Sequence, residues 1–171
     1  MLDILRADGF GDDAISHGFT TRDGGVSEGP YASLNLSWSR GDDKAAVEEN
    51  RRRLGAAFKA RPVFARQVHG NTVLRVDDAP ADGAAGEGDA LITNQPGLAL
   101  CAQTADCTPV LFHDPVAGVI GACHSGWRGS YGGISASTVA AMEKLGAKRE
   151  NITAAVGPCI ARKSYEVDGA F

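Results

Sequence analysis

Short apolar runs separated by polar or glycine-containing breaks cover much of the chain and predict β-strands. Two of them, residues 63–68 and 72–76, flank the tripeptide His69-Gly70-Asn71 and predict a hairpin. Further strand-like runs lie at residues 98–103, 110–113, 118–123 and 152–156. Residues 77–89 are rich in alanine, glycine and acidic side chains, which predicts a surface excursion between strands.

Two other segments show the spacing of amphipathic helices. Residues 44–58 place Val47, Leu54 and Phe58 on one face, and Asp42-Asp43 can cap the first turn. Residues 134–145 repeat apolar side chains with a helical period and end at Gly146, a common residue just after a helix. Strands that alternate with helices in this way predict a layered α/β domain.

Length and composition point to one soluble domain. The chain has 171 residues, of which 43% are hydrophobic and 22% charged, as in an ordinary globular protein. A net charge of −4 argues against a protein that wraps nucleic acid, which would carry a basic face. No run approaches the roughly 20 apolar residues of a membrane span, and the first residues do not form a secretory signal. We therefore expect a cytoplasmic domain with reduced cysteines.

Three potential metal ligands, His69, Cys107 and His124, each lie in a polar or glycine-rich break beside an apolar run. Two imidazoles and a thiolate are a sufficient protein set for a catalytic zinc with one open position. Cys107 and His124 are equally compatible with a nucleophile and base that use no metal. Redox copper is disfavoured, because four scattered histidines cannot build a cluster of several coppers.

The neighbouring residues distinguish these candidate ligands from the other histidines and cysteines of the chain. His124 follows an apolar run and should point away from Cys123, which we expect in the core. His113 alternates with apolar residues and is expected to be structural, as is His17 beside Gly18-Phe19. Cys101 and Cys159 are likewise expected to be reduced, mostly buried thiols.

The chain resembles the YfiH family, also called the laccase-domain or polyphenol oxidase family. The resemblance rests on six motifs in order: residues 18–27 (GFTTRDGGVS), 33–36 (SLNL), 67–70 (QVHG), 104–107 (TADC), 124–129 (HSGWRG) and 157–160 (GPCI). It implies a four-layer α/β/β/α sandwich of mixed sheets, related to a toxin deamidase domain that uses cysteine and histidine. It also implies a zinc ion held by His69, Cys107 and His124.

The resemblance implies an activity on purine nucleosides. Phosphorolysis of adenosine, inosine, guanosine and methylthioadenosine is expected, together with deamination of adenosine. Asp106, next to the Cys107 ligand, is a candidate for proton transfer or for support of a histidine ligand. Arg22 and the amides of Gly24-Gly25 are candidates for a phosphate site. Asn35 and Gln67 are candidate substrate contacts, and Trp127 either stacks on the base or supports the turn after His124.

Two departures from the family pattern qualify these expectations. Ser125 stands where the family usually has alanine, a small change that should leave the turn intact. The family also continues beyond Phe171, so residues 1–171 are expected to be one YfiH-like domain without its C-terminal part. Two alternatives to the zinc enzyme stay open, a metal-free cysteine hydrolase or deamidase using Cys107 and His124, and a non-catalytic binding module.

Overall fold

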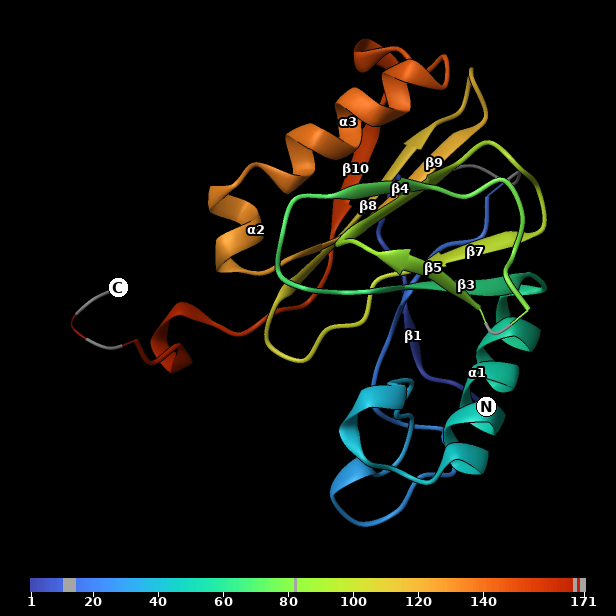
Figure 1. Ribbon diagram of the computed structural model, residues 1–171, viewed down its shortest axis with the longest axis vertical. Helices are drawn as coiled ribbons and strands as arrows, with labels where there is room; N and C mark the ends of the chain where they lie inside the picture. Colours follow the sequence, from blue (N-terminus) through green and yellow to red (C-terminus); the bar gives the residue numbers. More distant parts are fainter. Residues whose placement is uncertain (11–14, 82, 168, 170–171) are drawn as a thin grey trace.

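The protein folds into four layers, with two β-sheets packed face to face between two helices (Figure 1). The computed structural model describes residues 1–10, 15–81, 83–167 and 169. Helix α3 (Ile134–Lys144) covers one sheet, and helix α1 (Lys44–Phe58) covers the other. The α/β/β/α architecture expected from the family resemblance is confirmed.

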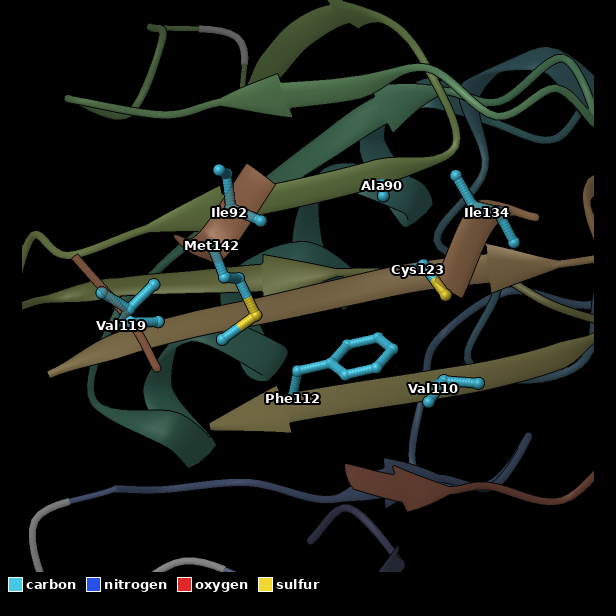
Figure 2. Packing of buried hydrophobic residues seen from close by; sticks show 9 residues of the cluster. Ala90, Ile92, Val110, Phe112, Val119, Cys123, Ile134 and Met142 are labelled. Atoms are coloured by element: carbon cyan, nitrogen blue, oxygen red, sulfur yellow. The ribbon is translucent and has the colours of Figure 1, made fainter. Parts of the chain in front are cut away.

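The larger sheet has five strands. Their order is β10 (Thr153–Val156), β8 (Thr108–Asp114), β9 (Val119–Ser125), β6 (Ala90–Thr93) and β4 (Val73–Arg75). Only the β4–β6 pair is parallel. Alternate side chains of β8 and β9 point toward α3, where Phe112 and Cys123 meet Ile134 and Met142 in the main core (Figure 2). The helix predicted over residues 134–145 is confirmed, and its apolar face is the one that packs on this sheet.

The smaller sheet is entirely parallel and packs between the larger sheet and α1. Strand β3 (Arg61–Arg66) runs between β5 (Ala84–Glu87) and β7 (Leu98–Cys101). Val63 of β3 packs with Leu91 of β6, so a second core joins the two sheets. On the outer face, Phe64 lies under the Arg51 guanidinium of α1, 3.9 Å from the ring centroid. Consecutive buried residues in β3 reflect this coverage on both faces.

The hairpin predicted around His69 is wrong. Strands β3 and β4 belong to different sheets, and the chain crosses from one sheet to the other between them. Each strand instead has parallel neighbours, which cannot be joined by a tight turn. The predicted surface excursion also contains β5, and it ends at the buried Asp89.

The N-terminal region forms an irregular lobe against α1. It contains the two-residue strands β1 (Ile4–Leu5) and β2 (Phe19–Thr20). Asn50, fully buried in α1, accepts a hydrogen bond from the amide of Val26 (2.8 Å) and donates to the carbonyl of Asn35 (2.9 Å). Asp43 caps α1 by accepting from Ala45 N at 3.0 Å, as predicted. The buried polar Asn50 therefore holds the lobe to the helix.

The remaining elements are short. Helix α2 (Trp127–Tyr131) forms where a tight turn was predicted, with Gly126 at its N-cap. Single 3₁₀ turns occur at Gly29–Tyr31, Trp38–Arg40, Arg149–Asn151 and Arg162–Ser164. After β10 the chain leaves the body of the molecule (Figure 1), and Phe171 lies outside the described residues. Within the described ranges, no helix has the length and apolar character needed to cross a membrane.

Candidate metal centre

The structure brings His69, Cys107 and His124 together at one end of the two sheets. Their potential ligand atoms all lie within 4.8 Å of one another. The two imidazole rings meet edge to face, with centroids 4.7 Å apart and an interplanar angle of 82°. It is the single group of three or more potential ligands in the part of the chain that the structure describes. Residues 38 and 17 positions apart along the chain thus converge on one point.

Each ligand comes from a different part of the fold. His69 lies in the crossover between the two sheets, with a left-handed φ of 61° that is uncommon for a side-chain-bearing residue. Cys107 immediately precedes β8, and His124 is the second-last residue of β9. Strands β8 and β9 are antiparallel neighbours with Pro109 opposite His124, which brings the start of one strand next to the end of the other.

The carboxylate of Asp89 forms hydrogen bonds with both histidines. It is 2% exposed and lies one residue before β6. Its Oδ1 atom accepts from the His69 amide at 2.9 Å and lies 2.8 Å from Nδ1 of His124. Its Oδ2 atom accepts from the amides of Val68 (3.1 Å) and Gly70 (2.8 Å). One carboxylate therefore shapes the His69 loop and orients the His124 ring.

The charge of Asp89 is maintained despite its burial. Burial is the largest single influence and opposes ionisation, but hydrogen bonds from the His124 ring and three backbone amides lower the pKa of Asp89. An ionised carboxylate can only accept hydrogen bonds, so Nδ1 of His124 must carry the proton. The Nε2 lone pair of His124 is then free to bind a metal, as in carboxylate–histidine–zinc arrangements.

Cys107 approaches the histidines through a gap that only glycine leaves. A Cβ atom built on Gly126 would lie 2.9 Å from the Cys107 Sγ atom and 3.0 Å from Cδ2 of His69. Burial, followed by the negative charges of Asp106 and Asp89, raises the pKa of the Cys107 thiol. A metal ion is the species that would stabilise the thiolate here, since it supplies the positive charge that these surroundings lack.

The donor set fits zinc. Two imidazole nitrogens and one thiolate are soft-to-borderline ligands, and three protein ligands leave the fourth tetrahedral position open. His69 is exposed and Cys107 is half-buried, so solvent reaches two of the three residues that would hold the metal. His17 and His113 lie elsewhere, both against the Phe10 ring, and Nε2 of His17 accepts from the Ala7 amide at 3.2 Å.

Comparison with known proteins identifies the family of this chain. Residues 16–171 match the model of the multi-copper polyphenol oxidoreductase laccase family. The chain belongs to this family. It is 53% identical over 169 residues to a purine nucleoside phosphorylase of Deinococcus radiodurans, covering 97% of this chain and 64% of that protein. It is 51% identical over 157 residues to a purine nucleoside phosphorylase of Corynebacterium glutamicum, covering 90% of this chain and 64% of the relative.

Solved structures of family members have the same fold. The crystal structure of a Neisseria meningitidis protein matches with a TM-score of 0.86 at 33% identity, over 97% of this chain and 66% of that one. YfiH of Bacillus licheniformis matches with a TM-score of 0.80 at 37% identity, over 90% of this chain and 61% of its own. The chain thus spans somewhat less than two thirds of the length of these relatives.

The candidate substrate residues of this family member lie in two places. Arg22 and Asn35 belong to the N-terminal lobe, where Arg22 donates to the Ala32 carbonyl (2.9 Å from Nε) and Asn35 donates to Asp42 (2.9 Å). Gln67 lies near the metal ligands and bonds to the backbone of Gln103. The roles of all three in substrate binding stay predictions.

Two further residues border the ligands. Asp106 is exposed beside Cys107, and its backbone carbonyl accepts from Ile160 N at 3.0 Å. Trp127 is 45% exposed, and the Arg128 guanidinium lies 4.5 Å from its ring centroid. The carboxylate that supports His124 is Asp89, which the sequence analysis missed because the residue falls in a segment that reads as a polar loop.

Proposed function

We propose that this chain carries the metal site of a zinc-dependent enzyme that cleaves purine nucleosides by phosphorolysis. The observation that carries the proposal is the convergence of His69, Cys107 and His124 within 4.8 Å, in a chain about half identical to purine nucleoside phosphorylases. Adenosine, inosine, guanosine and methylthioadenosine are the proposed substrates, with deamination of adenosine as a second reaction.

His69, Cys107 and His124 would hold the zinc ion. When bound, zinc would supply a Lewis acid that polarises a substrate atom and lowers the pKa of a coordinated water to roughly 7. Hydrogen bonds within the protein orient the residues that would hold the metal. Asp89 keeps the Nδ1 proton of His124 in place, and the amides of residues 68–70 fix the position of the His69 loop.

Phosphorolysis requires a second, anionic substrate. An oxygen of phosphate forms a bond to the anomeric carbon of ribose while the bond from that carbon to the purine nitrogen breaks. The exposed Arg22 and the backbone around Gly24-Gly25 are the proposed phosphate contacts, and Asn35 and Gln67 the proposed polar contacts. In deamination, water replaces the amine of adenosine and ammonia leaves. Asp106 is the proposed group for moving protons in that reaction, because it is exposed next to Cys107.

Three alternatives fit the geometry less well. A metal-free cysteine hydrolase needs a thiolate at Cys107, whereas burial and neighbouring carboxylates raise the pKa of this thiol. Laccase chemistry needs several coppers, whereas two of the four histidines lie apart from the ligand group. A purely binding module gives no reason for a buried carboxylate to orient an imidazole beside a thiol.

A turnover assay tests the proposal. Adenosine is incubated with the purified zinc-loaded chain, with and without phosphate, and the products are separated by chromatography. Phosphorolysis predicts adenine and ribose 1-phosphate only with phosphate. Deamination predicts inosine without phosphate, and inosine together with its phosphorolysis product hypoxanthine when phosphate is present. The Deinococcus radiodurans relative serves as the positive control. His69→Ala should abolish both products and His17→Ala should keep them; equal activity of the two variants would contradict the site.

A further inference from the structure

We infer that Gln67 is a positioning residue that holds the Cys107 loop at the metal site. Its side-chain amide makes two hydrogen bonds to the backbone of one residue, Gln103. Nε2 donates to the Gln103 carbonyl at 2.7 Å, and Oε1 accepts from the Gln103 amide at 2.8 Å. This inference rests on the metal site proposed above and gives Gln67 a second role beside its proposed contact with substrate.

The two hydrogen bonds extend the parallel sheet beyond its last backbone pair. Strand β3 ends at Arg66 and β7 ends at Cys101, and the final pair in the register is Phe64 with Cys101. Beyond these ends the strands no longer pair through their backbones. The Gln67 amide takes the place of a neighbouring strand, because it offers one donor and one acceptor to Gln103.

The two hydrogen bonds between Gln67 and Gln103, called the clamp below, lie close to the Cys107 thiol in the chain. Only residues 104–106, all exposed, separate Gln103 from Cys107. The chain on the other side of Cys107 enters β8 directly. A short loop held at both ends has fewer conformations to lose when its thiolate binds a metal, so the clamp should raise metal affinity.

The same short segment reaches all three ligands. Residues 67–70 include His69 itself. The backbone amides of residues 68–70 hold Asp89, which orients His124, and the Gln67 side chain holds the Cys107 loop. Preorganisation of the site thus depends on one crossover between the sheets. It follows that removing the Gln67 amide should affect the thiolate ligand and leave the histidine pair in place.

A double-mutant cycle measured with Co²⁺ tests this inference. Affinity is obtained by chelator competition for the wild type, Gln67→Ala, Cys107→Ala and the double variant. Gln67→Ala should weaken Co²⁺ binding about 10- to 100-fold, the range found for residues that support metal ligands. In the Cys107→Ala background the same change should have no further effect. The thiolate-to-cobalt charge-transfer absorption should weaken in Gln67→Ala.

Two further variants separate positioning from general destabilisation. Gln67→Glu keeps the size of the side chain but sets a carboxylate oxygen, which cannot donate, against the Gln103 carbonyl, so it should lose at least as much affinity as Gln67→Ala. Gln95→Ala removes an exposed amide on another loop and should bind Co²⁺ as the wild type does. Urea unfolding of each metal-free variant confirms that the fold is intact.

The outcomes distinguish this inference from the proposed function. An equal loss of affinity from Gln67→Ala in both backgrounds, or no loss in either, overturns the positioning role alone. Failure of the wild type to bind Co²⁺ overturns the positioning role and the metal site together. A chain that binds Co²⁺ with the expected cycle but turns over no nucleoside supports the positioning role and contradicts the proposed activity.

Discussion

A single oxygen atom of Asp89 lies 2.8 Å from Nδ1 of His124 and also accepts a hydrogen bond from the backbone amide of His69. One buried carboxylate therefore fixes both the ring of His124 and the backbone of His69. Such support raises the basicity of a metal-binding histidine and keeps its ring in one orientation. The relationship makes Asp89 as much a part of the site as the ligands are.

Asp89→Asn should weaken zinc binding by about 10- to 100-fold. The asparagine amide would place hydrogens against backbone N–H groups and would no longer hold the Nδ1 proton of His124 with a full charge. Competition with a chromogenic chelator measures the change. Asp77→Asn, at an exposed carboxylate paired with Arg75, is the matched control and should leave affinity unchanged. Equal affinities for the two variants would contradict the role of Asp89.

The same substitution should lower the stability of the metal-free chain in a pH-dependent manner. The pKa of Asp89 is lowered in the folded state, so its stabilisation is present at neutral pH and is lost as the pH falls below about 4. At pH 7 the loss should be about 3 kcal/mol, because the substitution weakens hydrogen bonds from three backbone amides and the His124 ring to a buried charge. Urea unfolding at pH 7 and pH 3 should show a large difference from the wild type at pH 7 and a smaller one at pH 3. A difference that grows toward pH 3 would have the wrong sign.

Cys107 should behave as an ordinary protonated thiol in metal-free protein. Its pKa is raised, so the rate of alkylation by iodoacetamide should keep rising with pH above about 8.5, the usual value for cysteine. Peptide mass spectrometry of the alkylated chain follows this site and Cys159 separately. Cys159 is exposed, so the buried thiol expected there from the sequence is wrong. Bound zinc should protect Cys107 and leave Cys159 reactive. A rate at Cys107 that is already maximal below pH 7 would instead favour the metal-free cysteine hydrolase.

Gly126→Ala should damage the metal site with little effect on the fold. The added methyl group would lie 2.9 Å from the Cys107 Sγ atom and 3.0 Å from the His69 ring, so the ligands must separate. We expect zinc affinity to fall at least about tenfold, equivalent to roughly 1.4 kcal/mol. Gly169→Ala is the control, since a methyl group there meets no atom within 4 Å. Unchanged affinity in Gly126→Ala would show that the ligand cluster is looser than described.

Asn50→Ala should loosen the N-terminal lobe without affecting metal binding. The substitution leaves the Val26 amide and the Asn35 carbonyl without their buried partner, at a cost of about 1–3 kcal/mol per group. Limited proteolysis should then cut the lobe faster, while zinc affinity stays at the wild-type value. Asn94→Ala, at an exposed loop position, is the control. A parallel loss of zinc affinity would show that lobe and site are coupled.

The sequence predicted the helices well because their signals are local. The Asp43 cap, the Val47 and Leu54 stripe and the Gly146 terminus each lie within a few residues of the structure that they determine. The sequence also predicted that Cys123 and His124 lie in different environments, because successive strand residues point to opposite faces. Cys123 is in the core beside α3, and His124 faces His69.

The errors share a physical cause, which is long-range pairing. His69-Gly70-Asn71 has the composition of a hairpin turn, but the residues that pair with β3 lie about 20 and 37 residues further along the chain. Asp89 lies in a glycine-rich acidic stretch, and its burial depends on three amides from residues 68–70. The only local sign of its importance was its place immediately before the apolar run of β6.

The metal content of the purified chain tests the central claim most directly. Elemental analysis should find one zinc per chain in the wild type and in His17→Ala, and a strongly reduced zinc content in His69→Ala and Cys107→Ala. One zinc that depends on both ligands would establish the site. Several coppers per chain, no bound metal, or one zinc retained in both ligand variants would contradict it.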